Sequence, residues 1–139
     1  MITVIFACVH NAGRSQMAAA FFNQRADPAM ARARSAGTAP GLRVYSEVVE
    51  VMREAGIELE GAQPTKLTPA LVADAALLIT MGCGDECPVV PGVRRADWPV
   101  EDPKGKPLDT VRAIREEIRG RVAALLESEG WAARPTPAT

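Results

Sequence analysis

Residues 2–15 read ITVIFACVHNAGRS, an apolar run followed by a turn of small residues and a polar helix start. The run Ile2–Ala7 is typical of a buried strand ending at Cys8, and Arg14 begins the predicted helix that follows. The turn between them aims its backbone N–H groups at the space above the Cys8 sulfur, where the helix N-terminus adds partial positive charge. Such a nest binds a tetrahedral oxyanion and favours the thiolate form of the cysteine. This stretch therefore predicts covalent chemistry on an oxyanion at the end of the first strand.

Strand-like and helix-like segments alternate along the rest of the chain. Ser46 is the expected N-cap of a helix that ends just before Gly56. The alternation favours an open parallel α/β sheet with right-handed crossovers. The expected strands are 2–7, 32–36, 75–81 and a short one near 93–98; the expected helices are 14–25, 46–55, 71–73 and 111–125.

Length and composition are those of one soluble globular domain. The chain has 139 residues, of which 47% are hydrophobic and 24% charged. We expect a catalytic domain over residues 1–132 and a flexible tail over 133–139. The formal net charge of −1 gives no reason to expect nucleic acid or an anionic membrane as partner. The first apolar run is too short to span a membrane and has no basic segment before it, so we expect a cytoplasmic protein.

The three cysteines are an odd number, which favours catalytic, redox or metal roles over a disulfide framework. Cys8 ends the first predicted strand and Cys83 lies just past the strand 75–81. Parallel strands end at one edge of the sheet, where ligands bind, so these two thiols should share a rim.

Several residues near Cys8 have a functional and an ordinary interpretation. Arg14 can clamp an oxyanion with two parallel donors, or it is a solvated arginine at a helix start. Ser15 can donate a hydrogen bond to the Cys8 thiolate, or it is a polar residue of the first helical turn. Asn11 is expected to hold the loop shape, and Gly13 to allow close backbone approach.

Two further residues invite acid–base roles. His10 is the only histidine, and no ligand set or histidine partner accompanies it, so we expect it to shape or gate the pocket. Asp102, followed by the rigid Pro103, can deliver a proton to a leaving oxygen. From the residues alone, a surface-loop aspartate is almost as good an interpretation.

Cys83 and Cys87 admit three interpretations. Two cysteines with three residues between them and one distant histidine do not fill a structural zinc site. Inert buried thiols are possible for any free cysteine, but a glycine-rich, charged loop is a poor place for core residues. The redox interpretation is the best of the three.

The motif at residues 8–15 resembles the signature of the low-molecular-weight tyrosine phosphatase superfamily. Residues 14–18 (RSQMA), 35–37 (SAG), 81–88 (MGCGDECP) and Trp98 before Asp102-Pro103 make the chain similar to its thioredoxin-coupled arsenate reductases. The resemblance covers nearly the whole chain and implies a four-stranded, Rossmann-like, three-layer fold. It implies these oxyanion-binding residues: Val9, His10, Asn11, Ala12, Gly13, Arg14 and Ser15.

The resemblance also implies a reaction without metal or organic cofactor. Cys8 attacks arsenate, Asp102 assists the leaving hydroxide, Cys83 attacks Cys8 as arsenite departs, and Cys87 then attacks Cys83. Arg14 holds the anion, and thioredoxin reduces the final disulfide. Closing the bond between Cys8 and Cys83 brings their Cα atoms within about 7 Å, so the segment 82–91 is expected to move.

Two features of the sequence depart from the family pattern. The commoner pattern has glycine at the position of His10, and well-known members have a longer insert between the two later cysteines. Because the loop between Cys83 and Cys87 is short, a second reductant remains an alternative: a small thiol acting with a glutaredoxin-like or mycoredoxin-type protein.

Two other functions remain open. A small phosphatase is the rival enzyme, but aromatics form only 4% of the chain and Tyr45 is the one tyrosine. An oxyanion-binding redox sensor is the non-enzymatic alternative. In each case we expect a monomer that also binds phosphate or sulfate as competing oxyanions.

Overall fold

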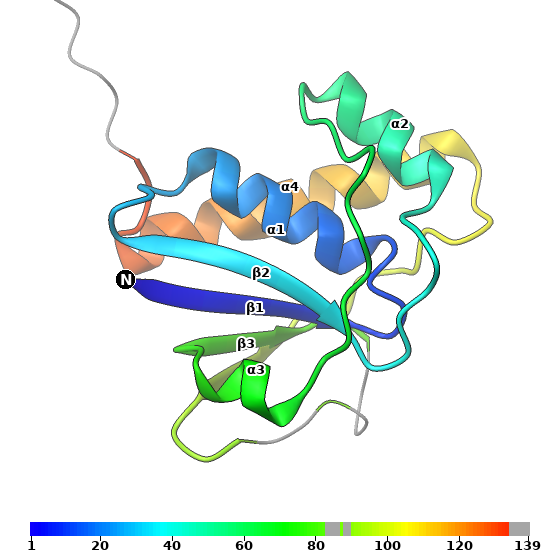
Figure 1. Cartoon of the computed structure of the whole chain (residues 1–139). Coiled ribbons are helices and arrows are strands. Elements are labelled where there is room, and N and C mark those ends of the chain that lie inside the picture. Colours follow the sequence, from blue (N-terminus) through cyan, green and yellow to red (C-terminus); the bar gives the residue numbers. More distant parts are fainter. Residues whose placement is uncertain (83–86, 88–89, 134–139) are drawn as a thin grey trace, which may run out of the picture.

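Four parallel strands form the sheet, in the order β2-β1-β3-β4 (Figure 1). The structure is a computed structural model that describes residues 1–82, 87 and 90–133. The central strands are β1 (Ile2–Cys8) and β3 (Leu77–Thr80), and the edge strands are β2 (Ala31–Gly37) and β4 (Arg94–Asp97). The predicted parallel α/β sheet is therefore confirmed, with β3 and β4 shorter than expected.

Helices cover both faces of the sheet and make three layers (Figure 1). On one face lie α1 (Arg14–Arg25), α2 (Ser46–Glu54) and α4 (Leu108–Glu129), and their apolar side chains share one core cluster with β1. On the other face lies the short helix α3 (Pro69–Ala73), above a smaller apolar cluster. The low-molecular-weight phosphatase-like fold is confirmed.

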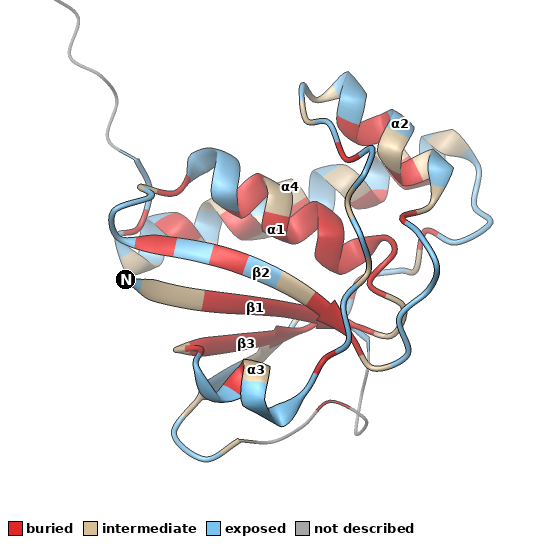
Figure 2. Cartoon of the chain, viewed as in Figure 1, coloured by how far each residue is buried: buried red, intermediate tan, exposed pale blue. Residues whose placement is uncertain are grey.

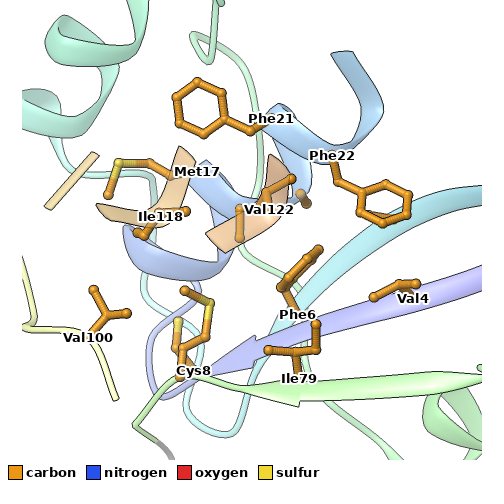
Figure 3. Packing of buried hydrophobic residues seen from close by; sticks show 14 of the residues in the cluster. Val4, Phe6, Cys8, Met17, Phe21, Phe22, Ile79, Val100, Ile118 and Val122 are labelled. Atoms are coloured by element: carbon orange, nitrogen blue, oxygen red, sulfur yellow. The ribbon is translucent and has the colours of Figure 1, made fainter. Parts of the chain in front are cut away.

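Burial along the strands follows their place in the sheet (Figure 2). The last five residues of β1 and all of β3 are buried, as expected for central strands covered on both faces. In β2 buried alanines alternate with exposed Arg32 and Arg34, which suits an edge strand. Figure 3 shows Cys8 at the end of β1 beside the buried apolar side chains of the larger cluster. The nucleophile candidate therefore stands on a rigid support.

One local prediction is wrong: Ser46 is not the N-cap of α2. Tyr45 has that position, because its carbonyl accepts the backbone N–H groups of Val48 and Val49. The Ser46 hydroxyl donates to the Glu47 carboxylate instead.

The predicted division into a domain and a tail stays a prediction, since residues 134–139 lie outside the described part. Among the helices of that part, none is long and apolar enough to cross a membrane.

Candidate active site

The loop between β1 and α1 surrounds the Cys8 sulfur. Cys8 is a free thiol and only 2% exposed. Asn11 adopts a left-handed conformation with φ of 50°, and its backbone N–H donates to the Cys8 sulfur at 3.3 Å. Ala12, Gly13 and the start of α1 at Arg14 continue the loop. Strand end, turn and helix start therefore form the loop geometry that the sequence predicts.

A chain of hydrogen bonds runs from the body of the protein to the sulfur. The Ser15 hydroxyl lies 2.9 Å from the Cys8 sulfur, and Asn11 Nδ2 donates to the same hydroxyl at 2.7 Å. Because the Ser15 oxygen accepts from Asn11, its own proton is free to point at the Cys8 sulfur. Asn11 Oδ1 accepts from the Thr65 backbone N–H at 2.9 Å and from the Gln16 side chain at 3.2 Å.

Sequence reasoning missed Gln16 and Thr65 as supports of this chain. Gln16 is buried, and its amide also donates to the Asn11 carbonyl and to the Gln63 carbonyl. A glutamine directly after the motif was a usable signal, because a buried amide requires partners. Nothing near Thr65 in the sequence indicated a contact with residue 11.

Arg14 is held from two sides at the first turn of α1. Its Nη1 donates to the buried Val100 carbonyl at 3.0 Å, and its Nη2 lies 3.8 Å from the Asp102 carboxylate. Gly82 has φ of +102°, and a Cβ on it would overlap the Arg14 guanidinium. The side chain of Arg14 is only 10% exposed, so the guanidinium is fixed before any anion arrives.

Asp102 lies beside Arg14, with 43% of its side chain exposed. Its Oδ1 accepts from the Lys104 backbone N–H at 3.0 Å, which orients the carboxylate. The structure therefore brings Asp102 to the same place as Cys8 and Arg14, although 88–94 residues of sequence separate them. A proton donor at this position could reach an oxygen of an anion bound to Arg14.

The segment 38–45, here called the rim segment, follows β2 and runs beside residues 8–13, here called the nucleophile loop. Its backbone N–H groups bond to carbonyls of that loop at four points, including Ala39 to Val9 at 2.8 Å and Tyr45 to Ala12 at 2.9 Å. His10 adds a fifth link, from its Nδ1 to the Ala39 carbonyl at 3.1 Å. The imidazole thus ties the rim segment to the loop, in line with a shaping role.

Tyr45 is a site residue that sequence reasoning did not assign. Burial raises the pKa of its phenol above the ordinary value, and the negative charges of Asp102 and Cys8 raise it further, while Arg14 lowers it. The phenol therefore stands within the field of the site and stays protonated at neutral pH. The motif gave no indication of this, because Tyr45 reaches the site through the rim segment.

The second cysteine pair is only partly described. Cys83 lies outside the described residues. Cys87 is disulfide-bonded and 2% exposed, packed in the smaller apolar cluster with residues such as Leu78. The expectation that the loop keeps its cysteines out of the core is therefore wrong for Cys87, because its side chain packs in the apolar cluster on the face of the sheet that α3 covers.

We looked for clusters of metal-binding side chains in the described ranges 1–82, 87 and 90–133. They contain no group of three or more His, Cys, Asp or Glu side chains placed to hold a metal ion.

The fold and the site together define a class: α/β proteins with a buried free cysteine at the end of the first strand, where the loop to the first helix begins. The family model described as low molecular weight phosphotyrosine protein phosphatase matches residues 3–131. The chain belongs to this family.

Two curated relatives and one solved structure within reach of this chain have names that refer to arsenate reductases. A Halobacterium salinarum protein named "Putative arsenate reductase" is 35% identical over 126 residues, 88% of this chain and 89% of its own. A Synechocystis protein named "Glutaredoxin arsenate reductase" is 31% identical and covers 91% of this chain and 97% of its own.

The thioredoxin-dependent arsenate reductase of Corynebacterium glutamicum has a TM-score of 0.79 and 38% identity over 92% of this chain. This chain spans 61% of that structure's chain, less than two thirds of it.

The hydrogen bond from Ser15 gives a first prediction. We expect Ser15→Ala to make the Cys8 sulfur less reactive at pH 6, because the sulfur loses its hydrogen bond with the Ser15 hydroxyl. The loss should slow alkylation of Cys8 by iodoacetamide roughly threefold to tenfold, the size of one charge-assisted hydrogen bond. The exposed Ser128→Ala is the matched control and should leave the rate unchanged. Equal rates for parent and Ser15→Ala would contradict the assignment.

Proposed function

We propose that the protein is an arsenate reductase in which Cys8 is the nucleophile. The observation that carries this proposal is a free, buried thiol at the end of β1, beside the fixed Arg14 guanidinium, with a disulfide-bonded cysteine just past the neighbouring strand β3. A phosphatase needs one cysteine, since water completes its reaction. Reduction of arsenate requires a further thiol, so that two cysteines can be oxidised to a disulfide as arsenic takes up two electrons.

The first step forms a bond between the Cys8 sulfur and arsenic. The thiolate attacks arsenate held by the loop and Arg14, and one arsenic–oxygen bond breaks. Asp102 gives a proton to the departing oxygen, which leaves as water or hydroxide. Arsenic remains in the +5 state in this adduct, and the two electrons needed for its reduction come from sulfur in the next step.

The second step breaks the sulfur–arsenic bond of that adduct, forms a disulfide and releases arsenite. The Cys83 thiolate attacks the Cys8 sulfur, the new sulfur–sulfur bond forms, and the arsenic–sulfur electron pair stays on arsenic as arsenite leaves. Cys87 then attacks Cys83 and frees Cys8. The free Cys8 and the disulfide-bonded Cys87 are the states expected at the end of this relay, which supports it.

An external thiol protein closes the cycle by reducing the disulfide. The relatives support two kinds, since one is named for thioredoxin and another for glutaredoxin. Cys87 is buried, so a reductant cannot reach the Cys87 sulfur in this arrangement and should attack the other sulfur of the disulfide. We propose thioredoxin, acting in the reducing cytoplasm on a monomer, with phosphate and sulfate as competing ligands of the same loop.

Single-turnover assays of the two later cysteines test the relay. Pre-reduced parent protein without an external reductant should release about one arsenite per molecule, as the relay's electron balance requires. Cys87→Ser should release the same amount but fail to cycle with thioredoxin, thioredoxin reductase and NADPH, whereas Cys83→Ser should release none. A p-nitrophenyl phosphate assay runs in parallel.

Three results would change the proposal. Turnover of Cys83→Ser at the parent rate would rule out the relay. Turnover only with a small thiol and a glutaredoxin-type protein would keep the reaction and replace the reductant. Phosphatase activity without arsenite would rule out the reductase.

A further inference from the structure

Gly13 and Pro103 approach each other more closely than any side chain at residue 13 would allow. A Cβ built on Gly13 would lie 2.7 Å from Pro103 Cγ and 3.4 Å from Pro103 Cδ. Real Cβ atoms essentially never come within 3.0 Å of a heavy atom outside their chain neighbours, so Pro103 or the backbone at residue 13 would have to shift. Pro103 is buried, although the residues on either side of it are not. The bare backbone at residue 13 therefore forms a seat for a proline 90 residues away.

The residues 98–107 between β4 and α4, here called the Asp102 loop, meet the Cys8 site at Pro103. They also meet it at Val100, whose carbonyl accepts the 3.0 Å hydrogen bond from Arg14. Asp102 lies between these two points, and its carboxylate is 3.8 Å from Arg14. A displaced proline would therefore carry its neighbour, the Asp102 carboxyl, away from the anion site.

Tyr45 completes the seat from the rim segment. The same Cβ on Gly13 would lie 3.4 Å from Tyr45 Cδ2, so the tyrosine ring borders the space that Pro103 fills. The Tyr45 backbone N–H donates to the Ala12 carbonyl at 2.9 Å, which anchors the Tyr45 main chain to the nucleophile loop. The influence of the Asp102 charge on the Tyr45 phenol agrees with this proximity.

We propose that Gly13 is a positioning residue: with Tyr45 it seats Pro103 and so sets where the Asp102 carboxyl stands. The catalytic consequence rests on the proposed function, in which Asp102 is the proton donor. Close approach of an anion to the backbone is the other reason for a glycine in such a loop. The two explanations for Gly13 predict different results, because only the seat for Pro103 makes the effect of a Cβ at residue 13 depend on Pro103 and Asp102.

Gly13→Ala is the test variant, and Gly41→Ala is its matched control. A Cβ on Gly41 would meet the His10 carbonyl and Ala12 Cβ at 3.8 Å and 3.9 Å, which are ordinary contacts beside the same loop. We expect Gly13→Ala to slow single-turnover arsenite formation roughly 10–100-fold, the effect of an acid misplaced by about 1 Å. Phosphate should inhibit it as it inhibits the parent, within about threefold. Gly41→Ala should match the parent in both measurements.

Two background substitutions separate the seat from the anion-binding explanation. In a Pro103→Ala background the Cγ and Cδ atoms are gone. In that background Gly13→Ala should slow single-turnover arsenite formation less than about threefold. In an Asp102→Asn background the proton donor is gone, and Gly13→Ala should again cost little. The high-pH limb of the pH–rate profile, on which a general acid loses its proton, should be lost in Gly13→Ala and in Asp102→Asn alike.

The inference is overturned if Gly13→Ala slows arsenite formation by the same factor in the parent, Pro103→Ala and Asp102→Asn proteins. It is also overturned if phosphate inhibition of Gly13→Ala weakens as much as the rate falls. If the parent forms no arsenite, the proposed function fails instead. A crystal structure of Gly13→Ala then decides the inference, since Pro103 and Asp102 must be displaced relative to Arg14.

Discussion

Cys8→Ser will form no arsenite above the uncatalysed background. The two electrons that reduce arsenic come from sulfur, and a serine oxygen cannot supply them. A hydroxyl is also a far weaker nucleophile than a thiolate, and the Cys8 sulfur is held by hydrogen bonds with the Asn11 N–H and the Ser15 hydroxyl. The assay is arsenite formation by the purified variant with thioredoxin, thioredoxin reductase and NADPH, including a single turnover of pre-reduced protein.

Binding separates this loss from misfolding. The loop N–H groups and Arg14 remain in Cys8→Ser, so phosphate titrated into the variant in a calorimeter should bind within about tenfold of the parent affinity. Arsenite formation by Cys8→Ser with intact phosphate binding would show that another thiol attacks arsenate. A redox sensor whose response survives in Cys8→Ser would favour the non-enzymatic alternative over an enzyme.

The architecture around Cys8 could be predicted from the sequence because it is local. The apolar run before Cys8 and the run that became β3 have no polar face, which only central strands of a covered sheet accept. Since parallel strands end at one edge, the placement of Cys8 and the end of β3 at one rim followed from the pattern alone.

The parts that could not be predicted are contacts between segments far apart in sequence. The Thr65 backbone N–H that holds Asn11, and the Val100 carbonyl that holds Arg14, are main-chain groups, so no residue type indicates them. Tyr45 and Pro103 were visible as residues, but their meeting at Gly13 depends on how two long loops fold.

The two wrong expectations have a similar origin. A serine at a helix start has a strong preference for the N-cap, yet Ser46 lost that position because the Tyr45 backbone is fixed by its bond to Ala12. Polar neighbours suggested exposure for Cys87, yet the sheet face beneath α3 needed apolar cover. In both cases tertiary packing outweighed the local signal.

Arg14→Lys should reduce kcat/KM for arsenate roughly 10²–10³-fold, even though it keeps the positive charge. The Arg14 guanidinium bonds to the Val100 carbonyl through Nη1 while Nη2 faces Asp102. A lysine presents its three N–H donors from a single nitrogen, so it cannot hold the buried Val100 carbonyl where Nη1 does and also offer two parallel donors to an anion. It also leaves unfilled the space above Gly82 that the planar guanidinium occupies.

Most of that loss should appear in KM, and phosphate should become a correspondingly weaker inhibitor, because the lysine loses the paired donors to two anion oxygens. Arg34→Lys is the matched control: Arg34 is exposed on the edge strand β2, and the substitution should leave both constants unchanged. Parent-like kinetics of Arg14→Lys would mean that charge alone holds the anion, and that the bond to Val100 serves only the fold. A fall in kcat with unchanged phosphate inhibition would instead place the role of Arg14 in the transition state, where negative charge builds up as the leaving oxygen departs.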